Sequence, residues 1–151
     1  MKKKVQKKQI RHQIRTEYLG KVYGKEFLTL VPKAVKKLRA IRRKHPFDAI
    51  AFTGSSGAAL AYTMSYFLKL PLIHVRKGAS HYGGGRVEGT ISSKKYIIID
   101  DFIDRGNTVR RIVKTITDEL KTPKPVAICL YSSGRTSSFE LNKKEIPVFS
   151  I

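Results

Sequence analysis

Four short stretches of the sequence are apolar at most positions, and they alternate with longer stretches that have helical spacing. These four stretches cover residues 48–52, 71–75, 96–99 and 126–131. A strand that is apolar on both faces needs cover on both sides, which helices provide in a parallel sheet. The pattern therefore predicts an α/β fold with a parallel sheet flanked by helices. Neither a repeat nor a linker interrupts it, so we expect residues 1–151 to form a single domain.

The segments around the predicted strands divide into helices, a loop and a tail. Apolar residues recur every three or four positions along residues 28–45, 58–70 and 108–120, which predicts three helices. Residues 77–89 contain five glycines and are predicted to form a long loop, and residues 147–151 a final short strand. Ligands of parallel α/β sheets bind at the carboxyl ends of the strands. The turns that follow the predicted strands are therefore the candidate sites.

The charge of the chain is strongly positive, with 31 Lys and Arg against 11 Asp and Glu and a formal net charge of +20. The first 45 residues carry +14 of this charge, because they hold 16 basic residues and only two acidic ones. Such a field attracts polyanions, which include phosphorylated metabolites, nucleic acid and acidic partners. A solvated basic surface gives the same composition. The charge alone therefore leaves the partner open.

The sequence gives no sign of export or of membrane insertion. It contains no run of roughly 18 apolar residues, and the basic N-terminus has no apolar segment behind it. The single cysteine, Cys129, lies inside a predicted strand and is expected to be a buried structural thiol. We expect a cytoplasmic protein with no membrane partner.

The turn after residues 96–99 holds the most informative group of side chains. Asp100 and Asp101 come directly after the apolar strand, and a glycine-containing turn then leads to Thr108 and a helix. Backbone N–H groups converge at such a helix N-terminus and form a site for a phosphate. Two carboxylates beside a phosphate fit a ligand that also presents hydroxyls or a metal ion. A sugar phosphate with a Mg²⁺-bound diphosphate meets all of these demands.

Residues 96–108 resemble the signature of the type I phosphoribosyltransferase family. In that signature, four apolar residues precede two acidic residues, two variable ones and a short Thr/Gly-rich loop. The resemblance implies a Rossmann-like α/β core that binds phosphoribosyl pyrophosphate (PRPP) and Mg²⁺. It also implies that Asp100 and Asp101 hold the ribose hydroxyls and contact the metal indirectly, through PRPP or water.

The loop that follows the acidic pair is implied to bind PRPP through Asp104, Arg105, Gly106, Asn107 and Thr108, with the loop around the 5′-phosphate. In purine-type members the first loop residue is an aspartate beside the base that accepts or donates a proton, and Asp104 takes that catalytic place. Arg105 and Asn107 stand where the family usually has Thr or Gly. Arg105 either adds a phosphate contact or crowds the loop, and a plain polar turn is the alternative interpretation.

A second stretch, residues 71–89, is similar to orotate phosphoribosyltransferases, in which a strand ends in Arg-Lys and a mobile loop follows. The resemblance implies that Arg76 and Lys77 bind the diphosphate. It also implies that Lys77 and His81 act in catalysis, where cations that close over the leaving group stabilise the transition state. A glycine-rich surface loop with incidental basic residues is the alternative.

The turn after the first predicted strand matches the family's diphosphate loop in position. It consists of Thr53, Gly54, Ser55, Ser56 and Gly57, whose backbone amides are implied to bind the diphosphate. It lacks the basic residue that some members carry there, and similar turns end many strands. Its place in the chain order, before the other two stretches, supports the match.

The resemblance covers residues 47–131 and leaves little chain for the hood that selects the base in this family. We expect a reduced hood from residues 1–30 and 132–151, with the basic segment 1–27 in the hood or in an interface. The implied activity is the Mg²⁺-dependent transfer of ribose 5-phosphate from PRPP to a nitrogenous base, with release of diphosphate and a lean towards orotate or another pyrimidine. By the same resemblance we expect a homodimer.

Two other interpretations stay open. The fold also serves regulators that sense PRPP or nucleotides and bind RNA or DNA, such as the pyrimidine-operon attenuators of the family. The charge of residues 1–45 favours such a regulator, whereas the catalytic loop favours the enzyme. The third interpretation is a degenerate domain that binds neither ligand well.

Overall fold

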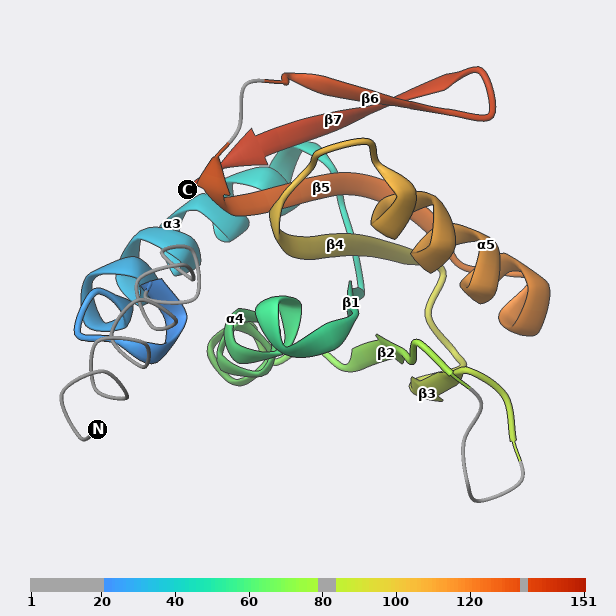
Figure 1. Cartoon of the computed structure of the whole chain (residues 1–151), viewed down its shortest axis with the longest axis horizontal. Helices are drawn as coiled ribbons and strands as arrows, with labels where there is room; N and C mark the ends of the chain where they lie inside the picture. The colour runs from blue at the N-terminus through green and yellow to red at the C-terminus, as the bar shows by residue number, and fades with distance from the viewer. Residues whose placement is uncertain (1–20, 79–83, 134–135) are drawn as a thin grey trace, which may run out of the picture.

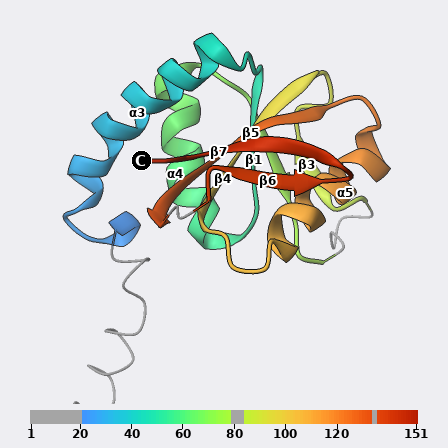
Figure 2. The same cartoon turned by 90° about the horizontal axis from the view of Figure 1, so that it is seen from above.

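The computed structural model describes residues 21–78, 84–133 and 136–151, so the predicted site residue His81 lies outside the described part. A sheet lies between two layers of helices (Figure 1 and Figure 2). No helix within the described ranges is long and apolar enough to cross a membrane. The elements are, in chain order, α3 (Phe27–Lys44), β1 (Ala49–Phe52), α4 (Gly54–Leu68), β2 (Leu72–Val75), β3 (Val87–Gly89), β4 (Lys95–Phe102), α5 (Asn107–Leu120), β5 (Lys124–Ser133), β6 (Ser138–Leu141) and β7 (Lys144–Ser150).

The seven strands form one mixed sheet in the order β3-β2-β1-β4-β5-β7-β6. The five central strands are parallel to one another, as the sequence predicts. The two edge strands run antiparallel, β3 on β2 and β6 on β7. The prediction of a parallel sheet therefore holds for the centre of the sheet and is wrong at its two edges.

The edge strand β3 lies within residues 77–89, for which the sequence predicts only a loop. Glu88 holds it in place, because its carboxylate accepts a 2.6 Å hydrogen bond from Arg76 and lies 3.4 Å from His74 Nδ1. The hydrogen bond from Arg76 keeps the pKa of Glu88 below its ordinary value. His74 is half-buried and stacks on Phe52 with ring centroids 4.7 Å apart. The pairing of β3 thus depends on cross-strand polar contacts that apolar periodicity does not detect.

The alternation of side chains along the strands divides the core into two halves. Ile97 and Ile99 pack with α3 and α4, whereas Tyr96 and Ile98 pack with α5, and all four are fully buried. Because β4 is covered on both faces, it is apolar at each of these positions. Cys129 lies in the half beneath α3 and α4, and burial raises the pKa of its thiol to about 12. The predicted burial of this thiol is confirmed.

The boundaries of the elements differ from the predicted ones where a strand meets a helix. α4 begins four residues before its predicted start, at Gly54, so most of the predicted glycine and serine turn belongs to a helix. β4 continues through Asp100 and Asp101 to Phe102, and α5 begins at Asn107. Polar residues that face a cavity can extend a strand or a helix without adding to its apolar pattern.

The described residues of the segments predicted to form a reduced hood pack on the body of the fold. Residues 138–141 and 144–150 are strands that extend the sheet beyond β5. At the other end of the described chain, Val22 is buried in the core beneath α3 and α4. Lys21 Nζ donates hydrogen bonds to the backbone oxygens of Tyr131 and Ser132, at 3.5 and 3.3 Å. The described parts of these segments therefore contribute to the sheet and to the core.

Candidate functional site

A cavity of about 480 Å³ opens where the carboxyl ends of β1 and β4 meet the first turns of α4 and α5. It unites the two turns that the sequence singles out, because parallel strands end at the same edge of the sheet. Of the predicted site residues that the structure describes, only Gly57 and Arg76 do not line it. Its lining comprises Thr53, Gly54, Ser55, Ser56, Lys77, Asp100, Asp101, Phe102, Ile103, Asp104, Arg105, Gly106, Asn107, Thr108, Val109 and Arg111.

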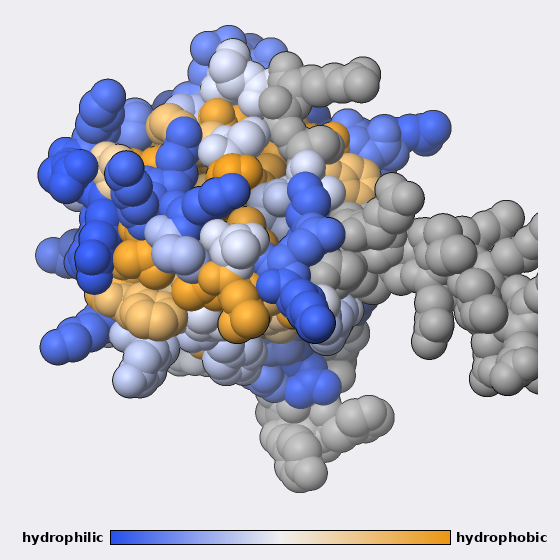
Figure 3. Space-filling model, turned by 90° about the vertical axis from the view of Figure 1, so that its left-hand side faces the viewer, coloured by the Kyte–Doolittle hydropathy of each residue, from blue (hydrophilic) through white to orange (hydrophobic). Residues whose placement is uncertain are grey.

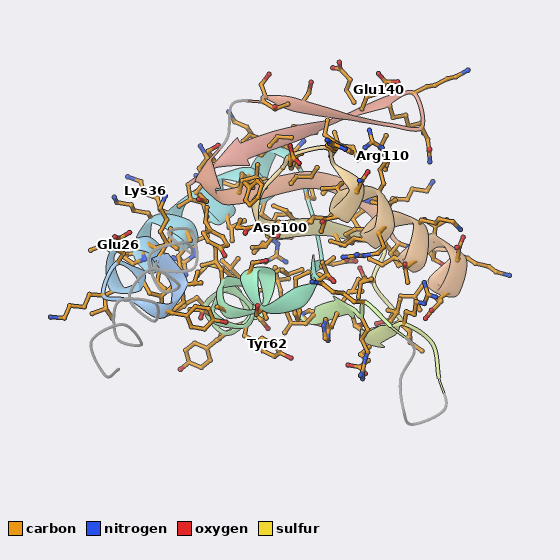
Figure 4. The ribbon with its side chains drawn as sticks, in the orientation of Figure 1. Glu26, Lys36, Tyr62, Asp100, Arg110 and Glu140 are labelled. Carbon is orange, nitrogen blue, oxygen red and sulfur yellow. The ribbon has the colours of Figure 1, made fainter. Side chains whose placement is uncertain are left out.

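Asp100 and Asp101 are the buried acidic residues of the cavity, with 4% and 6% of their surfaces exposed. Successive side chains of a regular strand face opposite sides of the sheet, but the pairing of β4 with β5 shifts register here and both residues line the cavity. Asp100 lies in the interior of the molecule (Figure 4). It accepts hydrogen bonds from the backbone N–H of Asp101 at 3.0 Å and from the Ser56 hydroxyl at 3.4 Å.

The ionised form of Asp100 is unfavourable in this environment. Burial, together with the hydrogen bond and the negative charge of Asp101, raises the pKa of Asp100 to about 7. A cation or a hydroxyl donor placed next to the pair would favour the ionised form. The acidic pair is therefore suited to a ligand that brings hydroxyls or a metal ion.

The turn after β1 is held so that its backbone faces the cavity. Thr53 Oγ1 donates a 2.6 Å hydrogen bond to the Val75 carbonyl, which ties the end of β1 to the end of β2. Gly54 has a φ of +64°, a left-handed conformation that favours glycine. The first N–H groups of α4 have no partners within the helix and border the cavity. This arrangement suits an anion such as a phosphate group.

Gly57 has a packing role. A Cβ atom there would lie 3.0 Å from the Ile99 carbonyl oxygen and 3.1 Å from the Phe52 Cβ, so a glycine lets α4 approach β1 and β4 closely. The Tyr131 hydroxyl donates a 2.7 Å hydrogen bond to the Ser56 carbonyl and fixes the first turn of α4 from β5. Gly57 thus positions the cavity wall and does not itself line the cavity.

The loop between β4 and α5 forms the opposite wall. Gly106 precedes α5 with a φ of +76°, and a Cβ atom there would overlap the Phe139 ring of β6. Arg110 lies over that ring, 4.9 Å from its centroid, and donates a 2.7 Å hydrogen bond to the Arg105 carbonyl. The next residues begin α5, where N–H groups without helical partners attract anions. The cavity is therefore bordered by two helix N-termini, each suited to an anionic group.

Comparisons with known proteins agree with this architecture, although no protein-family profile matches the chain. An orotate phosphoribosyltransferase of Listeria monocytogenes serotype 4b is 31% identical over 106 residues, which are 64% of this chain and 51% of that protein. The transcriptional regulator GfcR 2 of Methanosarcina barkeri is 27% identical over 120 residues, which are 76% of this chain and 58% of the regulator. The chain thus spans about half the length of the orotate phosphoribosyltransferases that it matches.

A solved structure extends the likeness to the fold. The adenine phosphoribosyltransferase of Thermoanaerobacter pseudethanolicus superposes with a TM-score of 0.56 at 18% identity, over 80% of this chain and 77% of that one. The chain therefore resembles phosphoribosyltransferases in sequence and shares the fold of one. Its predicted family resemblance and its α/β fold are confirmed.

Basic side chains line the cavity on two walls. Lys77 follows β2 and lines the cavity, and a methyl group at Gly54 would lie 3.8 Å from its Nζ. Arg105 lines the opposite wall, between β4 and α5. The guanidinium of Arg76 is paired with Glu88 on β3 and does not line the cavity.

Arg111 is a residue of the cavity that the sequence reasoning missed. It lines the cavity from α5, and its Nε is buried without a hydrogen-bond partner among the described residues. Helical side chains lean towards the N-terminus of their helix, so a residue one turn into α5 reaches back towards the preceding loop. The four-residue spacing from Asn107 to Arg111 was the signal that places both on one helical face. Its buried N–H is suited to an anionic group in the cavity.

The acidic pair also fits the Mg²⁺ that the family implies. Mg²⁺ takes oxygen ligands and is usually held by one or two carboxylates together with substrate phosphates and water. Asp100 and Asp101 offer such carboxylates, and burial beside Asp101 raises the pKa of Asp100, so a cation there would favour its ionised form. These residues therefore suit an ion that is shared with a phosphorylated ligand.

Proposed function

We propose that this chain is a Mg²⁺-dependent phosphoribosyltransferase that transfers ribose 5-phosphate from PRPP to a nitrogenous base and releases diphosphate. The supporting observation is the single cavity in which the acidic pair, the first turns of two helices and Lys77 meet. The acidic pair corresponds to the ribose hydroxyls of PRPP. The first turns of the two helices correspond to its 5′-phosphate and its diphosphate, and Lys77 corresponds to the diphosphate as it leaves. The match of the chain to an orotate phosphoribosyltransferase agrees with this activity.

In this proposal each wall of the cavity holds one part of PRPP. Asp100 and Asp101 hold the ribose hydroxyls and contact the metal through PRPP or water. The loop from Asp104 to Thr108 binds the 5′-phosphate through its N–H groups, next to Arg105 and Arg111. The turn that begins at Thr53 binds the diphosphate together with Lys77.

The reaction then forms a bond from a ring nitrogen of the base to C1 of the ribose. The bond from C1 to the diphosphate oxygen breaks, and its electron pair leaves with the diphosphate. The base nitrogen loses its proton, which we assign to the Asp104 carboxylate. Because the ribose becomes positively charged in the transition state, Asp100 and Asp101 stabilise it, while Lys77 balances the leaving diphosphate. His81 is proposed to add a cation there. Bound Mg²⁺ supplies charge neutralisation of the diphosphate.

The proposed acceptor is a small aromatic base, with orotate first. The matched relatives named orotate phosphoribosyltransferase support this order, as do Arg76 and Lys77, which directly follow β2. We further propose that the protein works in the cytoplasm as a homodimer. Light scattering after gel filtration tests the dimer directly.

Calorimetric titration of PRPP with Mg²⁺ is the test of the proposed site. We expect binding to the wild-type chain and its loss in the double variant Asp100→Asn/Asp101→Asn. Asp118→Asn is the matched control, because Asp118 is an exposed residue of α5 that pairs only with Lys114 among the described residues. Binding in turn justifies a screen of bases for diphosphate release. Equal PRPP affinity in the wild type and the double variant would contradict the site, and no release with any base would contradict the transferase.

A PRPP- or nucleotide-sensing regulator is the second candidate. The match to GfcR 2 over 76% of the chain favours it, as does the basic character of α3, whose last turn is Arg42-Arg43-Lys44. A regulator predicts an affinity for RNA or DNA that changes when PRPP or a nucleotide is added. If a bound nucleic acid is insensitive to both, the chain is not such a regulator.

A further inference from the structure

Apart from the cavity, α3 and α4 enclose a groove on the surface of the molecule. Two adjoining hollows of about 460 and 690 Å³ share Arg39, Arg43 and Phe67 among their lining residues, and together we call them the α3–α4 groove. Figure 3 shows the side of the molecule on which α3 lies, where apolar surface is surrounded by long hydrophilic side chains. None of the lining residues belongs to the cavity described above.

The rim of the α3–α4 groove is basic. Its lining includes Lys36, Arg39, Arg42, Arg43 and Lys69, all exposed, and it includes no acidic residue. The side chain of Lys36 projects away from the body of the molecule (Figure 4). Within the described residues the ion pairs lie elsewhere, on β2, β3 and α5. The positive charge of the groove is therefore not neutralised by neighbouring carboxylates of the described chain.

Aromatic surface lies next to this charge. Phe67 lines both hollows with 45% of its surface exposed, and the adjacent Tyr66 is 81% exposed. The two rings meet edge to face, with centroids 5.4 Å apart. Exposed aromatic rings beside a row of cations match the two parts of a single nucleic-acid strand, because bases stack on rings and phosphates pair with Lys and Arg.

The charge also argues against other occupants. Residues 1–20 hold seven Lys and Arg against one Glu, so they would bring like charge to the groove. A second copy of α3 would do the same. A membrane-surface helix needs an outward apolar face, whereas the apolar face of α3, with Leu30, Ala34, Leu38 and Ile41, is buried in the core. A flexible polyanion with flat apolar groups matches both the basic rim of the groove and the apolar surface beside it.

We propose that the α3–α4 groove binds single-stranded nucleic acid, with phosphates on the basic rim and a base against Phe67. The inference does not depend on phosphoribosyl transfer, because none of the groove residues lies in the PRPP cavity. A failed transfer assay therefore leaves it standing, and a failed nucleic-acid assay leaves the transferase standing.

The test is fluorescence anisotropy of the full chain with a labelled oligonucleotide of about 15 residues, over about 50 to 200 mM salt. The groove variant Lys36→Gln/Arg39→Gln/Arg43→Gln is compared with Lys124→Gln/Lys143→Gln/Lys144→Gln, which removes the same charge from exposed residues of β5, the β6–β7 turn and β7. We expect the groove variant to lose at least about tenfold in affinity and its salt slope to flatten by about two units, for three lost phosphate contacts. The control variant keeps the wild-type slope.

Phe67→Ala separates stacking from charge, and we expect it to weaken binding about tenfold without a change in the salt slope. Equal losses in the two charge variants would overturn the proposal, because binding would then follow total charge. No binding at low salt would also overturn it. Three other results would assign the groove to another occupant. Tighter binding to anionic vesicles than to the oligonucleotide would indicate a membrane surface, and loss of a dimer in the groove variant would indicate a second copy of the chain. Tighter oligonucleotide binding after removal of residues 1–20 would indicate that this segment occupies the groove.

Discussion

Changing Asp100 to Asn is expected to stabilise the folded chain above neutral pH while it weakens PRPP binding. Burial and the neighbouring Asp101 raise the pKa of Asp100 from 3.8 to about 7. A carboxyl group with a raised pKa in the folded state adds stability at low pH, and this stability is lost as the pH rises through the folded-state pKa. Each unit of pKa difference corresponds to about 1.4 kcal/mol, so ionised Asp100 costs the folded state about 4 kcal/mol.

The assay is urea unfolding of the wild type and of Asp100→Asn, followed by circular dichroism at about pH 5 and about pH 8. Between these values the wild type is expected to lose about 3 kcal/mol of unfolding free energy relative to the variant, because Asp100 is ionised in the unfolded chain but keeps its proton in the folded chain up to about pH 7. The amide oxygen of the variant can still accept the hydrogen bonds from Ser56 and the Asp101 N–H. Asp118→Asn, at an exposed position, is expected to follow the wild type. Parallel pH profiles for Asp100→Asn and the wild type would refute the reasoning, and so would a less stable variant at the higher pH.

Three further predictions concern other residues of the site and the core. Arg111→Ala is expected to weaken PRPP binding about tenfold in calorimetry and to leave stability intact, because the buried Nε of Arg111 has no partner in the described chain. An unchanged affinity would show that Arg111 is not part of the site. Gly106→Ala is expected to lower the free energy of unfolding in urea by about 1–3 kcal/mol, because Gly106 has a positive φ and a Cβ atom there would overlap Phe139. Adding Phe139→Ala should restore part of that loss. An unchanged stability of Gly106→Ala would contradict the close packing of the loop against β6. Tyr96→Phe is expected to raise the unfolding free energy by about 1 kcal/mol, since it removes a buried hydroxyl that has no partner among the described residues, and a clear loss of stability would reveal one.

The centre of the fold could be predicted because burial on both faces leaves an unambiguous sequence pattern. Ile97, Ile98 and Ile99 alternate between the two halves of the core, and each half demands an apolar side chain. The β6–β7 hairpin leaves a weaker pattern. Its two-residue turn places Asn142 and Lys143 at φ values of 50° and 65°, where a second-position glycine would have signalled the turn. β7 contains Pro147, which is unusual inside a strand, so only the last residues of β7 suggest a strand from the sequence.

Some residues of the candidate site could likewise be found from the sequence, whereas the roles of others could not. Asp100 and Asp101 could be found from the sequence, because two acids at the end of an apolar strand have no place in a core. The packing role of Gly57 depends on its contacts with Ile99 and Phe52, which only the folded chain brings together. Likewise, the pairing of Arg76 with Glu88 follows from the antiparallel edge of the sheet, which apolar spacing does not reveal.

The position of Phe139 has a consequence for the order in which the chain can mature on the ribosome. Its ring packs at Gly106, and among the described strands β6 pairs only with β7. The loop at Gly106 therefore acquires this neighbour after both late strands have been synthesised. A nascent chain that ends after β5 already contains the acidic pair and the glycine turn, yet the face of the sheet beneath α5 still lacks Ile146 and Val148. The packing around the cavity should therefore be completed late in translation, well after the residues proposed to contact PRPP have been made.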